Sequence, residues 1–167
     1  MNGLCIFLRR ISAALLRKIN TQTDSSFSSV FCYHGRMTVT VIGTGFVGVV
    51  SSAVFASFGN TVYGLDVVED KITKLKQAQI PFYEPGLEEL VKSSLDKGNL
   101  HFTTSYEEAI KNADIIMIAV GTPSAVDGQA DLKYVFKAAE SLAPHLKQNA
   151  IVAIKSTVPP GTNDKVR

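Results

Sequence analysis

A glycine-rich turn follows a short apolar, β-branched run in the first third of the chain. The run spans 38–42, and the turn reads Gly43-Thr44-Gly45-Phe46-Val47-Gly48. Glycines at this spacing permit a tight turn, a close approach of the backbone to a ligand, and close packing of the next helix on the strand. The first N–H groups of that helix carry partial positive charge and favour a phosphate. The pattern therefore predicts that this turn binds the pyrophosphate of a dinucleotide.

An acidic residue stands at the end of the next apolar run, about twenty residues beyond the turn. Residues 61–65, Thr-Val-Tyr-Gly-Leu, lead directly to Asp66. A carboxylate at this place accepts hydrogen bonds from ribose hydroxyls and repels a 2′-phosphate, so the two motifs together favour NAD over NADP. A glycine turn without the acid is a weak signal, and a purely structural turn is the alternative interpretation.

Further candidate contacts follow the later strands. A continuous apolar run over 115–120 leads to Gly121-Thr122-Pro123-Ser124, and a run over 150–154 leads to Lys155-Ser156-Thr157. Ligands of parallel sheets bind at the carboxyl ends of the strands, so both turns are expected beside the glycine turn and Asp66. Each could also be an ordinary structural turn. The residues added to the candidate cofactor contacts are Gly121, Thr122, Pro123, Ser156 and Thr157.

Two features after the second strand are less specific. Lys71 lies about one helical turn beyond Asp66 and could reach the same ribose or its phosphate, although a single lysine more often lies on a solvated helix face.

The segment 80–87 contains two prolines and a glycine, which forbid a continuous helix. We expect Phe82 and Tyr83 to pack there as a local staple, with Glu84 as an alternative ligand contact.

The order of elements predicts an α/β fold. Strands are expected over 38–42, 61–65, 100–103, 115–120 and 150–154, and helices over about 46–58, 87–96 and 132–146. Strands that alternate with helices form a parallel sheet with right-handed crossovers. We therefore predict a single Rossmann-type, doubly wound domain over 37–167.

Local signals add detail to this fold. A helical face shared by Val68, Ile72 and Leu75 predicts a further helix after Asp66. Ser105 and Glu108 form a capping box, and Asp131 is expected to cap the helix that follows it. His101 stands alone between apolar residues, which indicates a structural role.

Composition limits the function. Residues 37–167 carry twelve basic and fourteen acidic residues, which argues against a nucleic-acid partner. No apolar run reaches the eighteen residues or so of a membrane span, and we expect a cytoplasmic protein. Cysteine occurs only at Cys5 and Cys32, so residues 37–167 contain neither a disulfide nor a cysteine metal site. Cys32 with His34 has no second pair of ligands, and no metal site is expected.

The first 36 residues form a basic extension, with five basic residues against one acidic residue. Apolar residues at helical spacing and a serine-rich stretch fit an organelle presequence or a helix that lies on a membrane surface. The interpretation that we favour is a translated leader without function, with Met37 as the natural start. In each case we expect a disordered or loosely attached tail outside the fold.

Residues 37–167 resemble the N-terminal NAD-binding domain of the UDP-glucose/GDP-mannose dehydrogenase family, and are most similar to the bacterial type of UDP-glucose 6-dehydrogenase. The motifs are Val41-Ile42-Gly43-Thr44-Gly45-Phe46-Val47-Gly48, Gly64-Leu65-Asp66, Tyr83-Glu84-Pro85-Gly86-Leu87, Val120-Gly121-Thr122-Pro123-Ser124, Ala130-Asp131-Leu132 and Lys155-Ser156-Thr157-Val158-Pro159-Pro160-Gly161-Thr162. The glycine motif is generic, whereas the three later proline-containing motifs, in this order and spacing, are specific.

The resemblance implies NAD contacts at the glycine turn, Asp66, Lys71, Thr122 and Thr157. It also implies that Thr157 borders the reacting centre and helps to position a water. The family oxidises the 6-hydroxyl of UDP-glucose to the carboxylate of UDP-glucuronate with two NAD, through a cysteine thioester, and acts as a homo-oligomer. A thiolate suits this chemistry because it both attacks and leaves readily.

The family's catalytic cysteine and lysine would lie beyond Arg167, so we expect a fragment that binds NAD and is inactive alone. Two other functions stay open. One is a fragment of a GDP-mannose or UDP-N-acetyl-sugar dehydrogenase, because the sugar-binding part is not within these residues. The other is a non-catalytic nucleotide-binding module, for which NAD affinity would not depend on Asp66.

Overall fold

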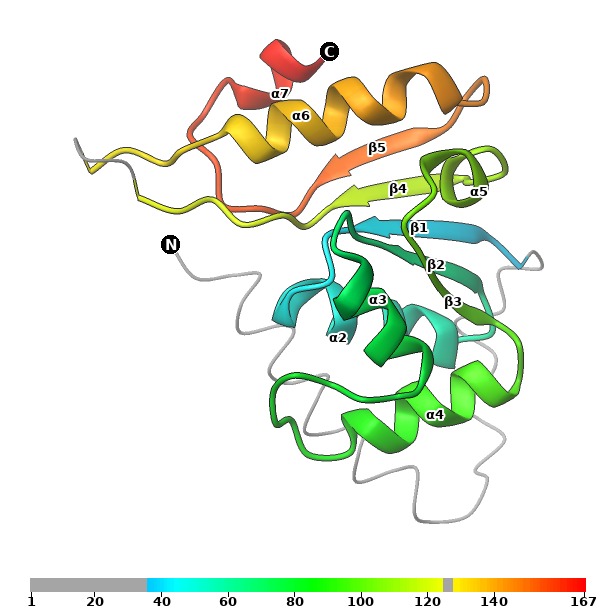
Figure 1. Cartoon of the computed structure of the whole chain (residues 1–167). Helices are drawn as coiled ribbons and strands as arrows, with labels where there is room; N and C mark the ends of the chain where they lie inside the picture. The colour runs from blue at the N-terminus through cyan, green and yellow to red at the C-terminus, as the bar shows by residue number, and fades with distance from the viewer. Residues whose placement is uncertain (1–35, 125–127) are drawn as a thin grey trace, which may run out of the picture. The chain divides into compact units, whose positions relative to one another are not determined.

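The computed structural model describes residues 36–124 and 128–167. Five strands there form one parallel sheet in the order β3-β2-β1-β4-β5 (Figure 1). The strands are β1 (Thr38–Ile42), β2 (Thr61–Leu65), β3 (Leu100–Thr103), β4 (Ile115–Ile118) and β5 (Ile151–Ile154). The helices are α2 (Phe46–Ser57), α3 (Glu69–Lys76), α4 (Leu87–Asp96), α5 (Tyr106–Ile110), α6 (Lys133–Leu142), the 3-10 helix η1 (Ala143–His145) and α7 (Thr162–Val166). The predicted Rossmann-type, doubly wound fold is confirmed.

Helices cover both faces of the sheet, and each face has its own core (Figure 1). Val39 and Val41 of β1 pack with buried residues of α2, α3 and α4. Ile42 belongs to the opposite core, which is shared with α5 and α6. Alternation along a strand sends successive side chains to opposite faces, so a strand covered on both sides is apolar throughout. Two threonines depart from this pattern in β1: Thr38 at its partly exposed start, and Thr40, which is fully buried and donates a hydrogen bond from its hydroxyl to the Ala109 carbonyl.

The predicted strands and the helix over 87–96 are all present, with small differences at their ends. β4 ends at Ile118, two residues earlier than predicted, because the chain turns there into the loop that carries Gly121. The predicted helix 132–146 is divided, since Pro144 lies in the first positions of the 3-10 helix η1 and cannot continue the α-helical hydrogen bonds. Helix α7 was not predicted; it begins after Gly161, whose φ of +82° suits glycine.

The predicted capping box is half correct. The Ser105 hydroxyl accepts a hydrogen bond from the Glu108 N–H (3.3 Å), as a cap should. The Glu108 carboxylate does not return to the Ser105 N–H. It accepts the Thr103 hydroxyl instead (2.5 Å), while the Thr103 oxygen accepts the Ser105 N–H (3.1 Å). The Thr103 hydroxyl thus bridges the Ser105 N–H and the Glu108 carboxylate, because it can donate and accept at once.

Two other local predictions need correction. Val68 does not share the buried face of Ile72 and Leu75: it is 41% exposed, because it occupies the non-helical position before α3. The Asp131 carboxylate accepts the Lys133 N–H (3.0 Å), but Leu132 is the residue at the helix boundary, so Asp131 lies one position too early for a standard cap. The predictions for residues 1–35, including Cys32 and His34, lie outside the described residues.

Candidate cofactor site

The carboxyl ends of β1, β2, β4 and β5 lie at one edge of the sheet, around the point between β1 and β4 where the strand order reverses. The chain leaves β1 for the α2 face and reaches β4 from the α5 face, so the connections diverge at this point. Such a switch point at the carboxyl ends of parallel strands is the usual ligand crevice of this fold. Hydrogen bonds tie the ends together: the Gly43 N–H donates to the Leu65 carbonyl (2.7 Å), and the Ala119 N–H donates to the Ile42 carbonyl (2.8 Å). The glycine turn, Asp66 and the Gly121 loop therefore belong to one edge.

Two of the three glycines of the turn have the structural roles that the sequence predicted, and the third leaves open space. Gly43 has a φ of +99°, and a Cβ there would lie 2.7 Å from the Ala119 carbonyl oxygen. A Cβ on Gly48 would lie only 1.8 Å from the Gly43 carbonyl oxygen, so the first turn of α2 can approach β1 only with glycine at that position. Gly45 has no atom within 4 Å of such a Cβ. Its open side is the space through which a pyrophosphate could approach the backbone.

The start of α2 is free to bind an anion. Gly45 is the residue before the helix, no side chain caps it, and the first turn contains no acidic residue. The first N–H groups of a helix have no partners within the helix and carry its positive partial charge. Phe46 and Val47, the first two residues of α2, are about half exposed. The helix therefore presents unpaired donors beside the open face of Gly45.

Asp66 lies beside the turn, and its carboxylate accepts three hydrogen bonds. Its Oδ2 accepts the N–H and the hydroxyl of Thr44, each at 2.8 Å, and its Oδ1 accepts the Val68 N–H at 3.1 Å. Burial raises the pKa of Asp66, but the hydrogen bonds from Thr44 and Val68 and the charge of Lys71 outweigh it and hold the pKa below its usual value. The side chain is therefore an anion at neutral pH, as an acceptor for ribose hydroxyls must be.

Lys71 has a partner in this site. Its Nζ lies 3.8 Å from Oδ2 of Asp66, and its side chain is half exposed. The lysine thus partly neutralises the carboxylate while its ammonium group keeps access to solvent. Lys71 therefore lies beside Asp66, and its contact with a ribose or phosphate stays a prediction.

The loops after β4 and β5 lie on the other side of the turn. Gly121, Pro123 and Thr157 are exposed, and Thr122 is half-buried. Within the described ranges, the Thr157 hydroxyl makes no hydrogen bond to the protein. The Ser156 hydroxyl, by contrast, donates to the Val120 carbonyl (2.6 Å), so it ties the two loops together. Of the two predicted hydroxyls after β5, the structure leaves Thr157 free for a ligand and uses Ser156 internally.

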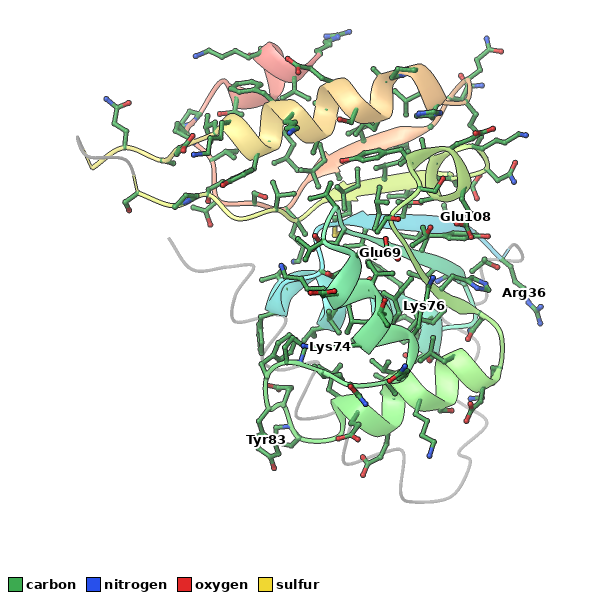
Figure 2. The ribbon with its side chains drawn as sticks, in the orientation of Figure 1. Arg36, Glu69, Lys74, Lys76, Tyr83 and Glu108 are labelled. Carbon is green, nitrogen blue, oxygen red and sulfur yellow. The ribbon has the colours of Figure 1, made fainter. Side chains whose placement is uncertain are left out.

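The segment 80–86 lies against the start of α2. The ring of Phe82 packs on that of Phe46, with 5.0 Å between the centroids and a tilt of 54°. The prediction that Tyr83 packs with it is wrong: Tyr83 is 88% exposed and points away from the fold in Figure 2. Pro81 and Pro85 fix an irregular loop that can turn only one of two adjacent rings inward.

Sequence reasoning missed two contacts of the site, the Thr44 hydroxyl on Asp66 and the ring of Phe82 on Phe46. Threonine within the glycine motif and the aromatic pair before Glu84 were the only signals.

Other features outside the site also bear on the predictions. His101 stacks on Tyr63 with 5.0 Å between the ring centroids, as a structural residue would. The described ranges contain no cluster of three or more possible metal ligands among His, Cys, Asp and Glu. No helix in that part of the chain has the length and apolarity to cross a bilayer.

Comparisons with known proteins agree with this geometry. A UDP-glucose 6-dehydrogenase of Rhizobium meliloti is 49% identical over 131 residues, which are 78% of this chain and 30% of the relative. A UDP-glucose 6-dehydrogenase of Bacillus subtilis is 45% identical over 130 residues, with the same coverage. The chain thus spans about 30% of the length of these relatives.

Solved structures show the same domain. A UDP-glucose dehydrogenase from Pyrobaculum islandicum matches with a TM-score of 0.73 and 43% identity, over 77% of this chain and 30% of that one. A GDP-mannose dehydrogenase from Pseudomonas aeruginosa matches with the same TM-score and 34% identity, over 78% of this chain and 30% of that one. Residues 37–167 match the model of the NAD binding domain of the UDP-glucose/GDP-mannose dehydrogenase family. The chain therefore belongs to this family, and its cofactor is NAD.

Proposed function

We propose that residues 37–167 are the cofactor-binding part of a UDP-glucose 6-dehydrogenase. In this proposal Asp66 and Lys71 receive the adenine ribose, and the pyrophosphate lies at Gly45 and the start of α2. The reactive end of NAD extends toward Thr122 and Thr157. The observation that carries the proposal is an anionic Asp66 beside a glycine turn with an open Gly45 and an uncapped helix start.

The residues fit the cofactor at each of these places. Ribose offers hydroxyl donors and Asp66 is an acceptor; a pyrophosphate is an anion and the start of α2 offers donors. When bound, NAD accepts the hydride that the alcohol loses. The chain's own contribution is to bind NAD, to orient it, and to disfavour NADP, whose 2′-phosphate would be repelled by Asp66.

We assign Thr157 a role at the reacting end. It is exposed, lies at the carboxyl end of β5, and has a hydroxyl that makes no hydrogen bond within the described ranges. Such a group can donate to one partner and accept from another, so it can hold a water in a defined orientation. This is a positioning role, and the thiol chemistry of the reaction needs a cysteine, which residues 37–167 do not contain.

UDP-glucose is the substrate that we favour. The dehydrogenase structure named for UDP-glucose is 43% identical to this chain, whereas those named for GDP-mannose and UDP-N-acetylmannosamine are 33–35% identical. The reaction would convert the 6-hydroxyl to a carboxylate with two NAD. We propose that the 167 residues alone bind NAD without turnover, and that the longer enzyme is a homo-oligomer.

The first test is an NAD titration of the 167-residue chain by calorimetry, compared with Asp66→Ala. We expect the substitution to weaken binding by about 1–3 kcal/mol, because the ribose hydroxyls lose their acceptor. An affinity that does not depend on Asp66 would instead support a non-catalytic nucleotide module. Circular dichroism of both proteins controls for folding.

The second test is an assay with UDP-glucose and NAD. Steady formation of NADH by the 167 residues would contradict the proposed inactivity. Sequencing the DNA past the codon for Arg167 and, where the reading frame stays open, assaying the longer product with UDP-glucose, GDP-mannose and UDP-N-acetylmannosamine would identify the substrate. A preference for either of the last two would overturn the proposed substrate and leave the NAD site standing.

A further inference from the structure

Thr44 makes an unusual pair of contacts within the glycine turn. Its backbone N–H and its side-chain hydroxyl both donate to the same atom, Oδ2 of Asp66, at 2.8 Å each. Thr44 is only 2% exposed, so its hydroxyl does not exchange freely with water. The turn does not need a hydroxyl for its shape, because the tight bend and the close helix approach depend on Gly43 and Gly48. The hydroxyl is therefore available for a task at Asp66.

The contacts of the carboxylate leave one oxygen open. A carboxylate oxygen accepts about two hydrogen bonds, and both positions of Oδ2 are taken by Thr44. Oδ1 accepts only the Val68 N–H, at 3.1 Å. Lys71 approaches Oδ2 at 3.8 Å, which is an ionic contact and not a hydrogen bond. Within the described residues, the acceptor position that remains for an incoming hydroxyl is thus on Oδ1.

We propose that Thr44 is a positioning residue that fixes the Asp66 carboxylate so that Oδ1 receives the adenine ribose. A rotation of the carboxylate would break the two hydrogen bonds from Thr44 and the one from Val68. The acceptor is thus oriented before the cofactor arrives, and binding does not have to supply the cost of ordering it. This inference rests on the proposed placement of the ribose at Asp66.

The same hydroxyl favours the charged form of the carboxylate. A donor to a carboxylate stabilises the anion, and Asp66 keeps a lowered pKa although its burial acts in the opposite direction. Two other titratable groups interact with its charge: Lys71 of α3, which also lowers the pKa of Asp66, and Tyr106 of α5, whose own pKa the charge of Asp66 raises. Burial raises the pKa of Tyr106, a hydrogen bond with Ser141 lowers it, and the charge of Asp66 raises it further; the net shift is upward, so Tyr106 stays neutral near neutral pH. Removal of the Thr44 hydroxyl should therefore move the protonation of Asp66 to a higher pH.

The test compares Thr44→Val, which removes the hydroxyl and keeps the shape, with Thr44→Ser, which keeps the hydroxyl. NAD binding to the 167-residue chain is measured by calorimetry between about pH 5 and 7.5. At neutral pH, Thr44→Val should bind NAD about tenfold more weakly, as expected for one hydrogen bond to a charged group. Its affinity should fall further toward the acid end of the range, whereas the wild type and Thr44→Ser should stay level. Equal losses in both variants, or no loss in Thr44→Val, would overturn the proposal.

A double-mutant cycle separates positioning from a general structural role. If the hydroxyl acts through Asp66, Thr44→Val should change NAD affinity by less than about twofold when Asp66→Asn is already present. Additive losses would overturn the proposal. If Asp66→Asn alone has no effect, the ribose placement itself is wrong. If Asp66→Asn weakens binding and Thr44→Val does not, only the role of Thr44 fails. Thr44→Ala, which also lacks the hydroxyl, replaces Thr44→Val in every arm if the valine variant does not fold.

Discussion

The two sides of the cofactor site differ in how their polar groups are used. On the first side, formed by the glycine turn, Asp66 and Lys71, the carboxylate already has three hydrogen bonds and an ionic partner within the protein. On the second side, formed by Gly121–Pro123 and Ser156–Thr157, the side chain of Thr157 is exposed and makes no hydrogen bond among the described residues. The first side is thus oriented in advance, while the second keeps groups free. Under the proposed placement of NAD, the ribose would meet the oriented side and the reacting end the open side, as suits a domain that holds a cofactor for chemistry performed next to it.

The largest effect is expected from Gly48→Ala on the first side. The added Cβ would lie 1.8 Å from the Gly43 carbonyl oxygen, so either the turn or the helix must move. We expect a loss of about 3 kcal/mol in the free energy of unfolding, measured by urea denaturation. Gly45→Ala is the control, since its Cβ meets no atom within 4 Å. It should cost less than about 1 kcal/mol in stability and still weaken NAD binding. Equal stability of the two variants would contradict the close packing described.

Phe82→Ala tests whether the loop over 80–86 supports the first side. It removes the ring that packs on Phe46 at 5.0 Å, and a loss of about 1–2 kcal/mol in stability is expected. The neighbouring variant Tyr83→Ala is a matched control, because Tyr83 is 88% exposed and should change stability by less than about 0.5 kcal/mol. Thermal denaturation of the two variants measures the difference. A larger effect from Tyr83 would mean that the loop packs in the opposite way.

Ser156→Ala and Thr157→Val separate adjacent hydroxyls on the second side. Ser156→Ala removes the hydrogen bond to the Val120 carbonyl and should cost about 1 kcal/mol in stability. Thr157→Val should leave the stability of the 167 residues unchanged and reduce turnover in a longer, active form. Urea denaturation covers the first expectation and steady-state kinetics the second. If Thr157→Val were the more destabilising of the two, the second side would not be open.

The smallest expected effect is a dependence of stability on pH that comes from the first side. The pKa of Asp66 is lowered in the folded state, so its contribution to stability is complete above its unfolded pKa. That contribution is lost as the pH falls through the lowered, folded pKa. Asp66→Asn should therefore reduce stability at neutral pH, and the difference from the wild type should shrink in acid. Urea denaturation at several pH values would show this, and a constant difference would contradict it.

Features of the site that depend on local chemistry could be predicted from the sequence. Glycine is the only residue type that fits at positions 43 and 48. Asp66 follows a strand whose end could be placed from its apolar pattern. The topology followed from alternating strands and helices, because right-handed crossovers leave few arrangements.

The missed features depend on tertiary neighbours. The local sequence does not predict that the Thr44 hydroxyl donates to Asp66, or that the Ser156 hydroxyl donates to the Val120 carbonyl. The choice between Phe82 and Tyr83 depended likewise on where α2 lies. Helix α7 has only five residues, too few for an apolar period to be visible.

An NMR titration of the isotopically labelled chain with NAD and, separately, with NADP tests the central claim most directly. The account predicts saturable changes at the amides of Gly45, Val47 and Gly48 and beside Asp66, with smaller changes around Thr122 and Thr157. NADP should produce the same pattern only at much higher concentration, because of the charge on Asp66. Changes centred on another surface, or equal binding of the two cofactors, would contradict the proposed site.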